Sequence, residues 1–165
     1  MTSSDILEGI SLAHHDLTEV NKLIRALPPS STIVYTYGAW DLLHPGHVLF
    51  LARAKNLGDF LVCGVVSDEP IKSLKGKSRP IQTSEERLIT TGSIRCVDAA
   101  IIQPDYDPTP HLLSLDRVDI LVKGDDWEYI PGTETIEKLG GKLVKLGYTD
   151  GFSTSKQVGK ITNID

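Results

Sequence analysis

The chain has 165 residues, 40% of them hydrophobic and 24% charged, and it carries a formal net charge of -5. This length predicts one globular domain, and the composition excludes intrinsic disorder and a coiled coil as descriptions of the whole chain. The acidic balance argues against a nucleic-acid partner, so an anionic ligand would need a local cluster of positive charge. Apolar stretches such as residues 60–66 are far shorter than the about 20 residues that cross a bilayer, so we expect a cytoplasmic protein with no membrane partner.

The first 31 residues form a predicted helical extension and linker, followed by a domain over residues 32–165. Residues 28–31 read PPSS, which predicts the end of a helix and a linker. We expect the helix either to pack on the outside of the domain or to form a dimer interface. Apolar side chains recur in it at helical spacing, namely Ile6, Ile10, Ala13, Leu17, Val20, Ile24 and Leu27.

From residue 32 onward, β-rich runs alternate with helical patterns. Strands are expected at residues 33–37, 60–66, 99–102, 120–123 and 142–146, and helices at residues 46–57, 85–95, 108–115, 133–139 and 153–161. Because parallel strands joined by helices need right-handed crossovers, this order predicts an α/β fold, a Rossmann-like doubly wound parallel sheet of about five strands. Ligands of such sheets bind beyond the carboxyl ends of the strands, so the turn after the first strand is the leading candidate site.

The turn between the first strand and the first helix, residues 37–47, reads YGAWDLLHPGH. His44 and His47 flank a Pro-Gly pair at the helix start, so both imidazoles are expected to face the strand ends. The same helix start offers unpaired backbone N–H groups and the positive end of the helix dipole, which favour phosphate. Gly38 and Gly46 let phosphate oxygens approach the main chain without a Cβ in the way. The turn therefore predicts a polyphosphate site.

This turn resembles the HxGH motif of the cytidylyltransferase-like nucleotidyltransferase superfamily, and the likeness extends over nearly all of residues 32–162. Four further segments are similar to motifs of that superfamily, in the same order along the chain. They are the basic segment KSLKGKSRP at residues 72–80, the ER and RCVD sequences within residues 86–98, VKGDDW at residues 122–127 and DGFSTS at residues 150–155. The resemblance implies a nucleoside triphosphate and a phosphorylated small-molecule acceptor as ligands, with release of pyrophosphate.

The resemblance also implies a role for each matching residue. His44, His47 and Lys75 are the expected catalytic residues: the imidazoles donate hydrogen bonds to the reacting phosphates and the lysine clamps the pyrophosphate. Lys77 is a second candidate for this clamp. The residues expected to bind the nucleotide are Tyr37, Gly38, Ala39, Trp40, Asp41, Gly46, Lys77, Gly124, Asp126, Trp127, Gly151, Phe152, Ser153 and Thr154.

Further expectations concern the charge of the phosphates and the metal that offsets it. Arg95 is expected to bind the substrate phosphate or to pair with Asp98. Mg²⁺ is the expected cofactor because it offsets the charge of a triphosphate, and the sequence assigns no protein ligand to it. Cys63 and Cys96 lack the spacing of a metal site or a disulfide, so neither is predicted.

The matching segments divide between two branches of the superfamily. GDDW at residues 124–127 resembles glycerol-3-phosphate cytidylyltransferases, which implies transfer of CMP from CTP to a phosphorylated polyol or sugar. Residues 75–80, 130–132 and 140–144 resemble instead the heptose-1-phosphate adenylyltransferases, which implies ATP and a sugar phosphate. Tyr148 stands where the cytidylyltransferases usually carry an arginine, and a neutral phenol cannot replace that fork-shaped donor. We expect CTP, with ATP as the alternative.

A third hypothesis is a non-catalytic, nucleotide-binding regulator that keeps the fold and docks a partner through its N-terminal helix. The presence of both motif histidines and of the lysine cluster disfavours it. The resemblance further implies a homodimer and an activated product that serves as a precursor of a surface polysaccharide.

Overall fold

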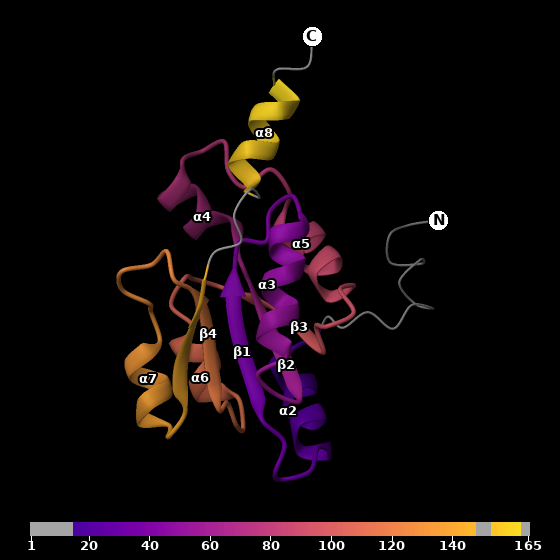
Figure 1. Cartoon of the computed structure of the whole chain (residues 1–165), viewed down its shortest axis with the longest axis vertical. Coiled ribbons are helices and arrows are strands. Elements are labelled where there is room, and N and C mark those ends of the chain that lie inside the picture. The colour runs from indigo at the N-terminus through magenta and orange to yellow at the C-terminus, as the bar shows by residue number, and fades with distance from the viewer. Residues whose placement is uncertain (1–14, 148–152, 163–165) are drawn as a thin grey trace.

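The computed structural model describes residues 15–147 and 153–162. Its strands are all parallel and form one sheet in the order β3-β2-β1-β4-β5 (Figure 1). The fold is therefore the Rossmann-like α/β sheet predicted from the sequence, and the predicted bounds of the second and fifth strands match. The strands are β1 (Ile33–Gly38), β2 (Phe60–Val66), β3 (Ala99–Gln103), β4 (Ile120–Gly124) and β5 (Lys142–Leu146).

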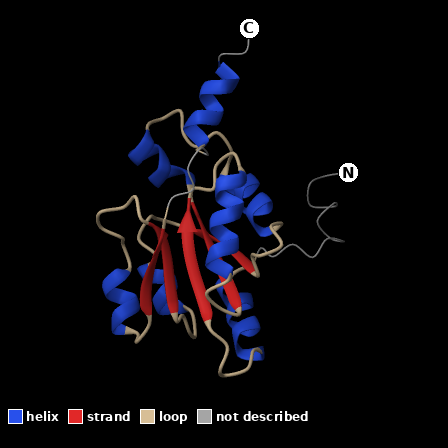
Figure 2. Ribbon diagram, viewed as in Figure 1, coloured by secondary structure: helices blue, strands red, loops and turns tan. Residues whose placement is uncertain are grey.

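Helices flank both faces of this sheet (Figure 2). None of the helices in the described part of the chain is long and apolar enough to cross a membrane. The described helices are α2 (Leu17–Ala26), α3 (Pro45–Lys55), α4 (Asp68–Lys75), α5 (Ser84–Gly92), α6 (Thr109–Ser114), α7 (Thr133–Lys138) and α8 (Thr154–Thr162).

The strand order reverses beside β1, the central strand. From β1 the chain proceeds outward to β2 and β3, and then crosses back so that β4 pairs with the other side of β1. The crossovers from β1 and β4 therefore diverge, which leaves a crevice at the carboxyl ends of these strands. In Figure 1 these ends point toward α4 and α8.

Side chains of β1 alternate between two buried cores, one on each face of the sheet. Val34 packs with Leu51 of α3 in one core. Tyr35 packs with Val20 of α2 and Leu112 of α6 in the other. Because both faces are covered, the central strands are apolar along nearly their whole length, as their sequences indicate.

The helix expected near the N-terminus is described from α2 onward. A capping box between Asp16 and Glu19 begins it, satisfying backbone N–H groups at the helix start. Val20 and Ile24 are buried against the sheet, and Arg25 forms an ion pair with a carboxylate that precedes β4. The part of the predicted helix before residue 15 lies outside the described residues.

The basic segment differs from the expected loop, because its first lysines belong to α4. Asp68 and Glu69 in the first turn and lysines in the last turn match the helix dipole, and buried Ile71 anchors the helix to the core. Gly76, with φ of 95°, ends the helix. Ile71 is the only buried residue of this short helix, and no helix is expected at these residues from the sequence.

Candidate functional site

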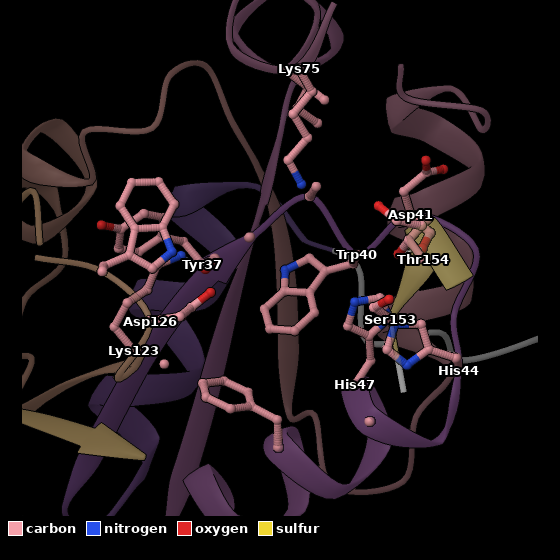
Figure 3. A pocket seen from close by; sticks show the side chains of 18 of the residues that line it. Tyr37, Trp40, Asp41, His44, His47, Lys75, Lys123, Asp126, Ser153 and Thr154 are labelled. Atoms are coloured by element: carbon pink, nitrogen blue, oxygen red, sulfur yellow. Dashed lines mark hydrogen bonds between the residues drawn. The ribbon is translucent and has the colours of Figure 1, made fainter. Parts of the chain in front are cut away.

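A pocket of about 640 Å³ opens at the carboxyl ends of β1 and β4, where the strand order reverses (Figure 3). It brings together the turn after β1, the basic segment, the GDDW segment and the start of α8. The residues assigned to the site from the sequence that line this pocket are Tyr37, Gly38, Ala39, Trp40, Asp41, His44, Gly46, His47, Lys75, Gly124, Asp126, Trp127, Ser153 and Thr154.

The pocket also has lining residues to which the sequence assigns no role. Arg79 belongs to the basic segment but has no function assigned within it. Lys123 is the one charged residue of β4, and a lysine in such an apolar run is the signal that could have identified it. The additional lining residues are Phe50, Ile71, Arg79, Lys123, Leu146, Gly147 and Ser155.

Other residues assigned from the sequence do not lie in this pocket. Lys77 is exposed and is not part of the pocket wall. Arg95 is exposed in the turn that precedes β3, at the amino ends of the strands, whereas the pocket lies at their carboxyl ends. Asp98 forms its ion pair with Lys55, at 2.7 Å. Predicted residues 151 and 152 lie outside the described residues.

The two motif histidines form a stacked pair at the start of α3. Their ring centroids are 3.8 Å apart with an interplanar angle of 21°. His44 is the N-cap residue of the helix and Pro45 occupies its first turn, as expected for a helix start. Trp40 meets the ring of His47 edge to face, with centroids 5.5 Å apart. The helix start thus presents backbone N–H groups and two imidazoles to the same side.

Burial keeps both imidazoles neutral. It lowers the pKa of His47 to about 3, with smaller contributions from His44 and the Lys75 ammonium, and it also lowers the pKa of His44. The Nδ1 atoms of both rings are buried without a hydrogen-bond partner in the described part of the chain. A neutral imidazole has one N–H donor and one acceptor, so each ring can donate one hydrogen bond to a phosphate oxygen.

The turn that carries the histidines is held in an uncommon backbone conformation. Trp40 and Leu42 have φ of 53° and 46°, in the left-handed region. The backbone N–H groups of Ile81 and Gln82 donate to the carboxylate of Asp41 at 2.9 and 3.0 Å. Asp41, expected to bind nucleotide, therefore ties the turn to the segment after the basic residues.

Arg87, the arginine of the ER sequence, also forms hydrogen bonds to the turn that carries the histidines. It is fully buried, and its guanidinium donates to the main-chain oxygens of Ala39, Val66 and Gln82. It also forms a 2.6 Å ion pair with Asp68 at the start of α4. One side chain thus links the ends of β1 and β2 to α4, which carries Lys75.

The positive charge of the pocket comes from the basic segment. Lys75 ends α4 and faces the histidines across the pocket in Figure 3. Burial, and then the nearby guanidinium of Arg79, lower the pKa of Lys75. Arg79 lies 3.8 Å from the carboxylate of Asp41, which holds it at the pocket wall. These two cations supply the local charge that a polyphosphate requires.

The start of α8 reaches the histidine turn directly. The hydroxyl of Thr154 donates to the main-chain oxygen of Asp41 at 2.9 Å. The Ser153 hydroxyl accepts a hydrogen bond from the backbone N–H of Lys156, at 3.1 Å, as a helix cap does. The pocket therefore has a second helix start beside the first.

The comparisons with known proteins agree with this arrangement. The family described as cytidylyltransferase-like matches residues 35–155 of the chain. The bifunctional protein HldE of Syntrophotalea carbinolica is 40% identical over 132 residues, which are 79% of this chain and 27% of that protein. The bifunctional protein HldE of Pelobacter propionicus is 34% identical over 168 residues, covering 96% of this chain and 34% of that protein. The chain thus spans only about a third of the length of these relatives, or less.

Solved structures give the same picture. The lipopolysaccharide core biosynthesis protein from Thermoplasma volcanium superposes with a TM-score of 0.63 at 29% identity, covering 73% of this chain and 100% of that chain. Pantoate-beta-alanine ligase from Francisella tularensis shares the fold, with a TM-score of 0.64 at 12% identity over 90% of this chain and 73% of that chain. Since the family match covers most of the chain and its motif residues converge on one pocket, the chain belongs to the cytidylyltransferase-like family.

Proposed function

We propose that this protein transfers AMP from ATP to a sugar phosphate and releases pyrophosphate. The observation that carries the proposal is the convergence of the stacked pair, His44 and His47, with Lys75 and Arg79 on one pocket at the strand ends. The sequence favours CTP over ATP, but the comparisons support the alternative better. The relatives are named bifunctional protein HldE, and residues 75–80 resemble the heptose-1-phosphate adenylyltransferases.

The reaction needs no base to activate its nucleophile, because a phosphate oxygen is already anionic at neutral pH. One oxygen of the acceptor phosphate forms a bond to the α-phosphorus of ATP, and the bond from that phosphorus to the bridging oxygen of the β-phosphate breaks. The electron pair of the broken bond leaves with pyrophosphate. The protein must therefore position the reactants and stabilise the charge that develops on the phosphate oxygens.

The pocket residues supply both requirements. His44 and His47 are neutral donors to the α-phosphate and the departing pyrophosphate, and one such preorganised donor accounts for about 10²- to 10³-fold in rate. Lys75 and Arg79, which line the same pocket, neutralise the β- and γ-phosphates. The helix starts at His44 and Ser153 add backbone N–H groups.

Mg²⁺ is proposed as the cofactor, carried mainly by the phosphates. No group of three histidine, cysteine or acidic side chains within residues 15–147 and 153–162 could hold a metal ion. Asp41 is occupied by backbone N–H groups, which leaves Asp126 as the pocket carboxylate that would contact the ion. This fits Mg²⁺, which binds through one or two carboxylates and substrate phosphates and, when bound, offsets the charge of the triphosphate.

Pyrophosphate release tests the proposal. The purified protein is assayed with ATP and with CTP, each against heptose 1-phosphate and glycerol 3-phosphate. We expect turnover with ATP and heptose 1-phosphate. Turnover with CTP and glycerol 3-phosphate would instead support the cytidylyltransferase reading. ATP binding without turnover, measured by calorimetry, would support the hypothesis of a non-catalytic, nucleotide-binding regulator.

The proposed homodimer is tested on the same sample by sedimentation.

A further inference from the structure

Lys123 is a buried cation to which the reaction described above gives no role. It lies on β4, is 7% exposed and still lines the pocket. Its Nζ donates a hydrogen bond of 2.7 Å to the main-chain oxygen of Tyr37. An ammonium has three N–H donors, and within residues 15–147 and 153–162 no carboxylate forms an ion pair with this one. Donors of Lys123 are therefore available to a ligand.

Two aromatic rings bracket this ammonium. Nζ lies 3.9 Å from the ring centroid of Tyr37 and 4.9 Å from that of Trp127, both within cation–π contact. Tyr106 packs against Trp127 in turn, with ring centroids 5.8 Å apart. The rings hold the ammonium in position and shield it from water, but they do not neutralise its charge. Such a position suits an anion more than a neutral group.

The location of Lys123 relative to the histidines matches the geometry of the reaction. In a displacement at phosphorus, the attacking and leaving oxygens lie in line on opposite sides. His44 and His47 begin α3 on one face of the sheet, whereas Tyr37, which holds Lys123, packs in the core on the other face. Trp40 stands between these two groups in Figure 3. With pyrophosphate held by the histidines, the side of Lys123 is left for the acceptor phosphate.

We propose that Lys123 binds the phosphate group of the acceptor and holds it for attack on the α-phosphorus. The inference rests on the proposed function, since it presupposes a phosphorylated acceptor. The ring of Trp127, half-buried beside the ammonium, is placed to pack against the sugar that this phosphate carries. Lys123 thus marks the acceptor end of the pocket, and the histidines mark the pyrophosphate end.

The charge state of Lys123 agrees with this role. Burial lowers its pKa to about 7, while the carboxylate of Asp126 opposes the shift and the Lys75 ammonium adds to it. A phosphate dianion beside the ammonium would raise the pKa again, so acceptor binding takes up a proton when the pH is above about 7.

Binding of the acceptor, measured without turnover, tests the proposal. The protein is saturated with α,β-methylene-ATP and titrated with heptose 1-phosphate by calorimetry. Lys123→Met removes the charge, and Lys123→Arg keeps it. Lys142→Met is the matched control, because Lys142 is exposed at the amino end of β5. We expect Lys123→Met to weaken heptose 1-phosphate binding by about 10- to 100-fold and to leave ATP affinity within about twofold.

The outcomes separate this inference from the proposed function. If wild type binds heptose 1-phosphate and a folded Lys123→Met variant binds it equally well, the role of Lys123 is wrong while the proposed function stands. If wild type neither binds nor turns over a sugar phosphate, the proposed function fails and this inference fails with it. If Lys123 had only a structural role, Lys123→Met would lower the melting temperature and would change acceptor affinity and ATP affinity alike. That result would also overturn this inference.

The pH dependence of wild type provides a test that needs no variant. A phosphate monoester is already a dianion above about pH 7, since its second pKa is near 6. Above its pKa of about 7 the protonated fraction of free Lys123 falls by up to about tenfold per pH unit, so between pH 7.5 and 8.5 the dissociation constant of heptose 1-phosphate should rise by up to about tenfold. A dissociation constant that stays flat across this range would contradict the proposal.

Discussion

His44 and His47 stack with their ring centroids 3.8 Å apart, and the neighbouring His44 adds to the burial that lowers the pKa of His47. Together with burial, this contact keeps the pair neutral at the start of α3, where backbone N–H groups already favour an anion. Each neutral ring has one N–H donor and carries no additional proton that the reaction would have to remove. The proposed reaction therefore relies on fixed donors to stabilise phosphate charge.

Removal of one imidazole tests this role. We expect His47→Ala to lower kcat by about 100-fold or more, because a preorganised donor to the reacting phosphates is lost. Pyrophosphate release under saturating substrates measures the effect. His15→Ala is the control, since His15 contacts Glu19 away from the pocket, and it should leave kcat unchanged. Near-normal kcat in a folded His47→Ala variant would remove His47 from the reaction.

The lysines of the basic segment are separated by their position relative to the pocket. Both lysines are exposed, but only Lys75 lines the pocket. Lys75→Ala should raise the KM for ATP by about tenfold or more through loss of a charged hydrogen bond, and Lys77→Ala should change it by less than about twofold. Equal effects of the two substitutions on the KM for ATP would contradict this assignment, as would an effect on acceptor KM alone.

Arg87 links three elements of the site through buried hydrogen bonds, so its loss should act on stability. Arg87→Met leaves the carboxylate of Asp68 and three main-chain oxygens without their donor. We expect the free energy of unfolding in urea to fall by about 3 to 5 kcal/mol. Arg53→Met is the control, because Arg53 is on the outer part of α3 and donates to a main-chain oxygen in an exposed contact. A loss below about 1 kcal/mol for Arg87→Met would show that the hydrogen bonds of Arg87 are not needed for stability.

The lowered pKa of His47 predicts how stability depends on pH. The folded protein holds this imidazole neutral down to about pH 3, whereas the unfolded chain protonates it near the ordinary histidine pKa of 6.5. Between these two pH values the unfolded state therefore binds more protons than the folded state. The contribution of His47 to stability is complete above about pH 6.5 and is lost as the pH falls. The slope from one such group is at most about 1.4 kcal/mol per pH unit.

Urea unfolding at pH 7, 6 and 5 measures this slope. His47→Asn removes the titrating group while keeping a polar side chain, so its unfolding free energy should fall less steeply over the same range. His15→Asn should keep the slope of wild type, since His15 lies in a partly exposed contact with Glu19. Parallel slopes for wild type and His47→Asn would mean that His47 is not the group responsible.

Local patterns were sufficient to predict most of the fold. The continuous apolar run of β2 indicates a strand covered on both faces, and the observed strand has the predicted bounds. The capping box of α5, with Thr83 and Glu86, is likewise visible in the sequence. Helix α4 was missed: it is only 8 residues long, and Ile71 is its one buried residue.

The site residues, too, were predicted from the sequence only in part. The histidine motif follows a strand and opens a helix, so its position at the strand ends follows from the chain itself. The assignment of Lys77 and Arg95 depended on motif likeness alone, and neither residue lies in the pocket. Motif likeness gives the order of segments along the chain but not the direction in which each side chain points.

By itself the sequence determined the parallel α/β sheet and the turn that brings both histidines to a helix start, because strand and helix periodicity and helix-start chemistry depend on residues close together in the chain. Only the tertiary structure decided which cations reach the pocket. Lys123 meets Tyr37, a residue 86 positions away, and Arg79 meets Asp41, because the sheet order places these segments side by side. Such contacts depend on the packing of distant segments, which no local pattern in the sequence records.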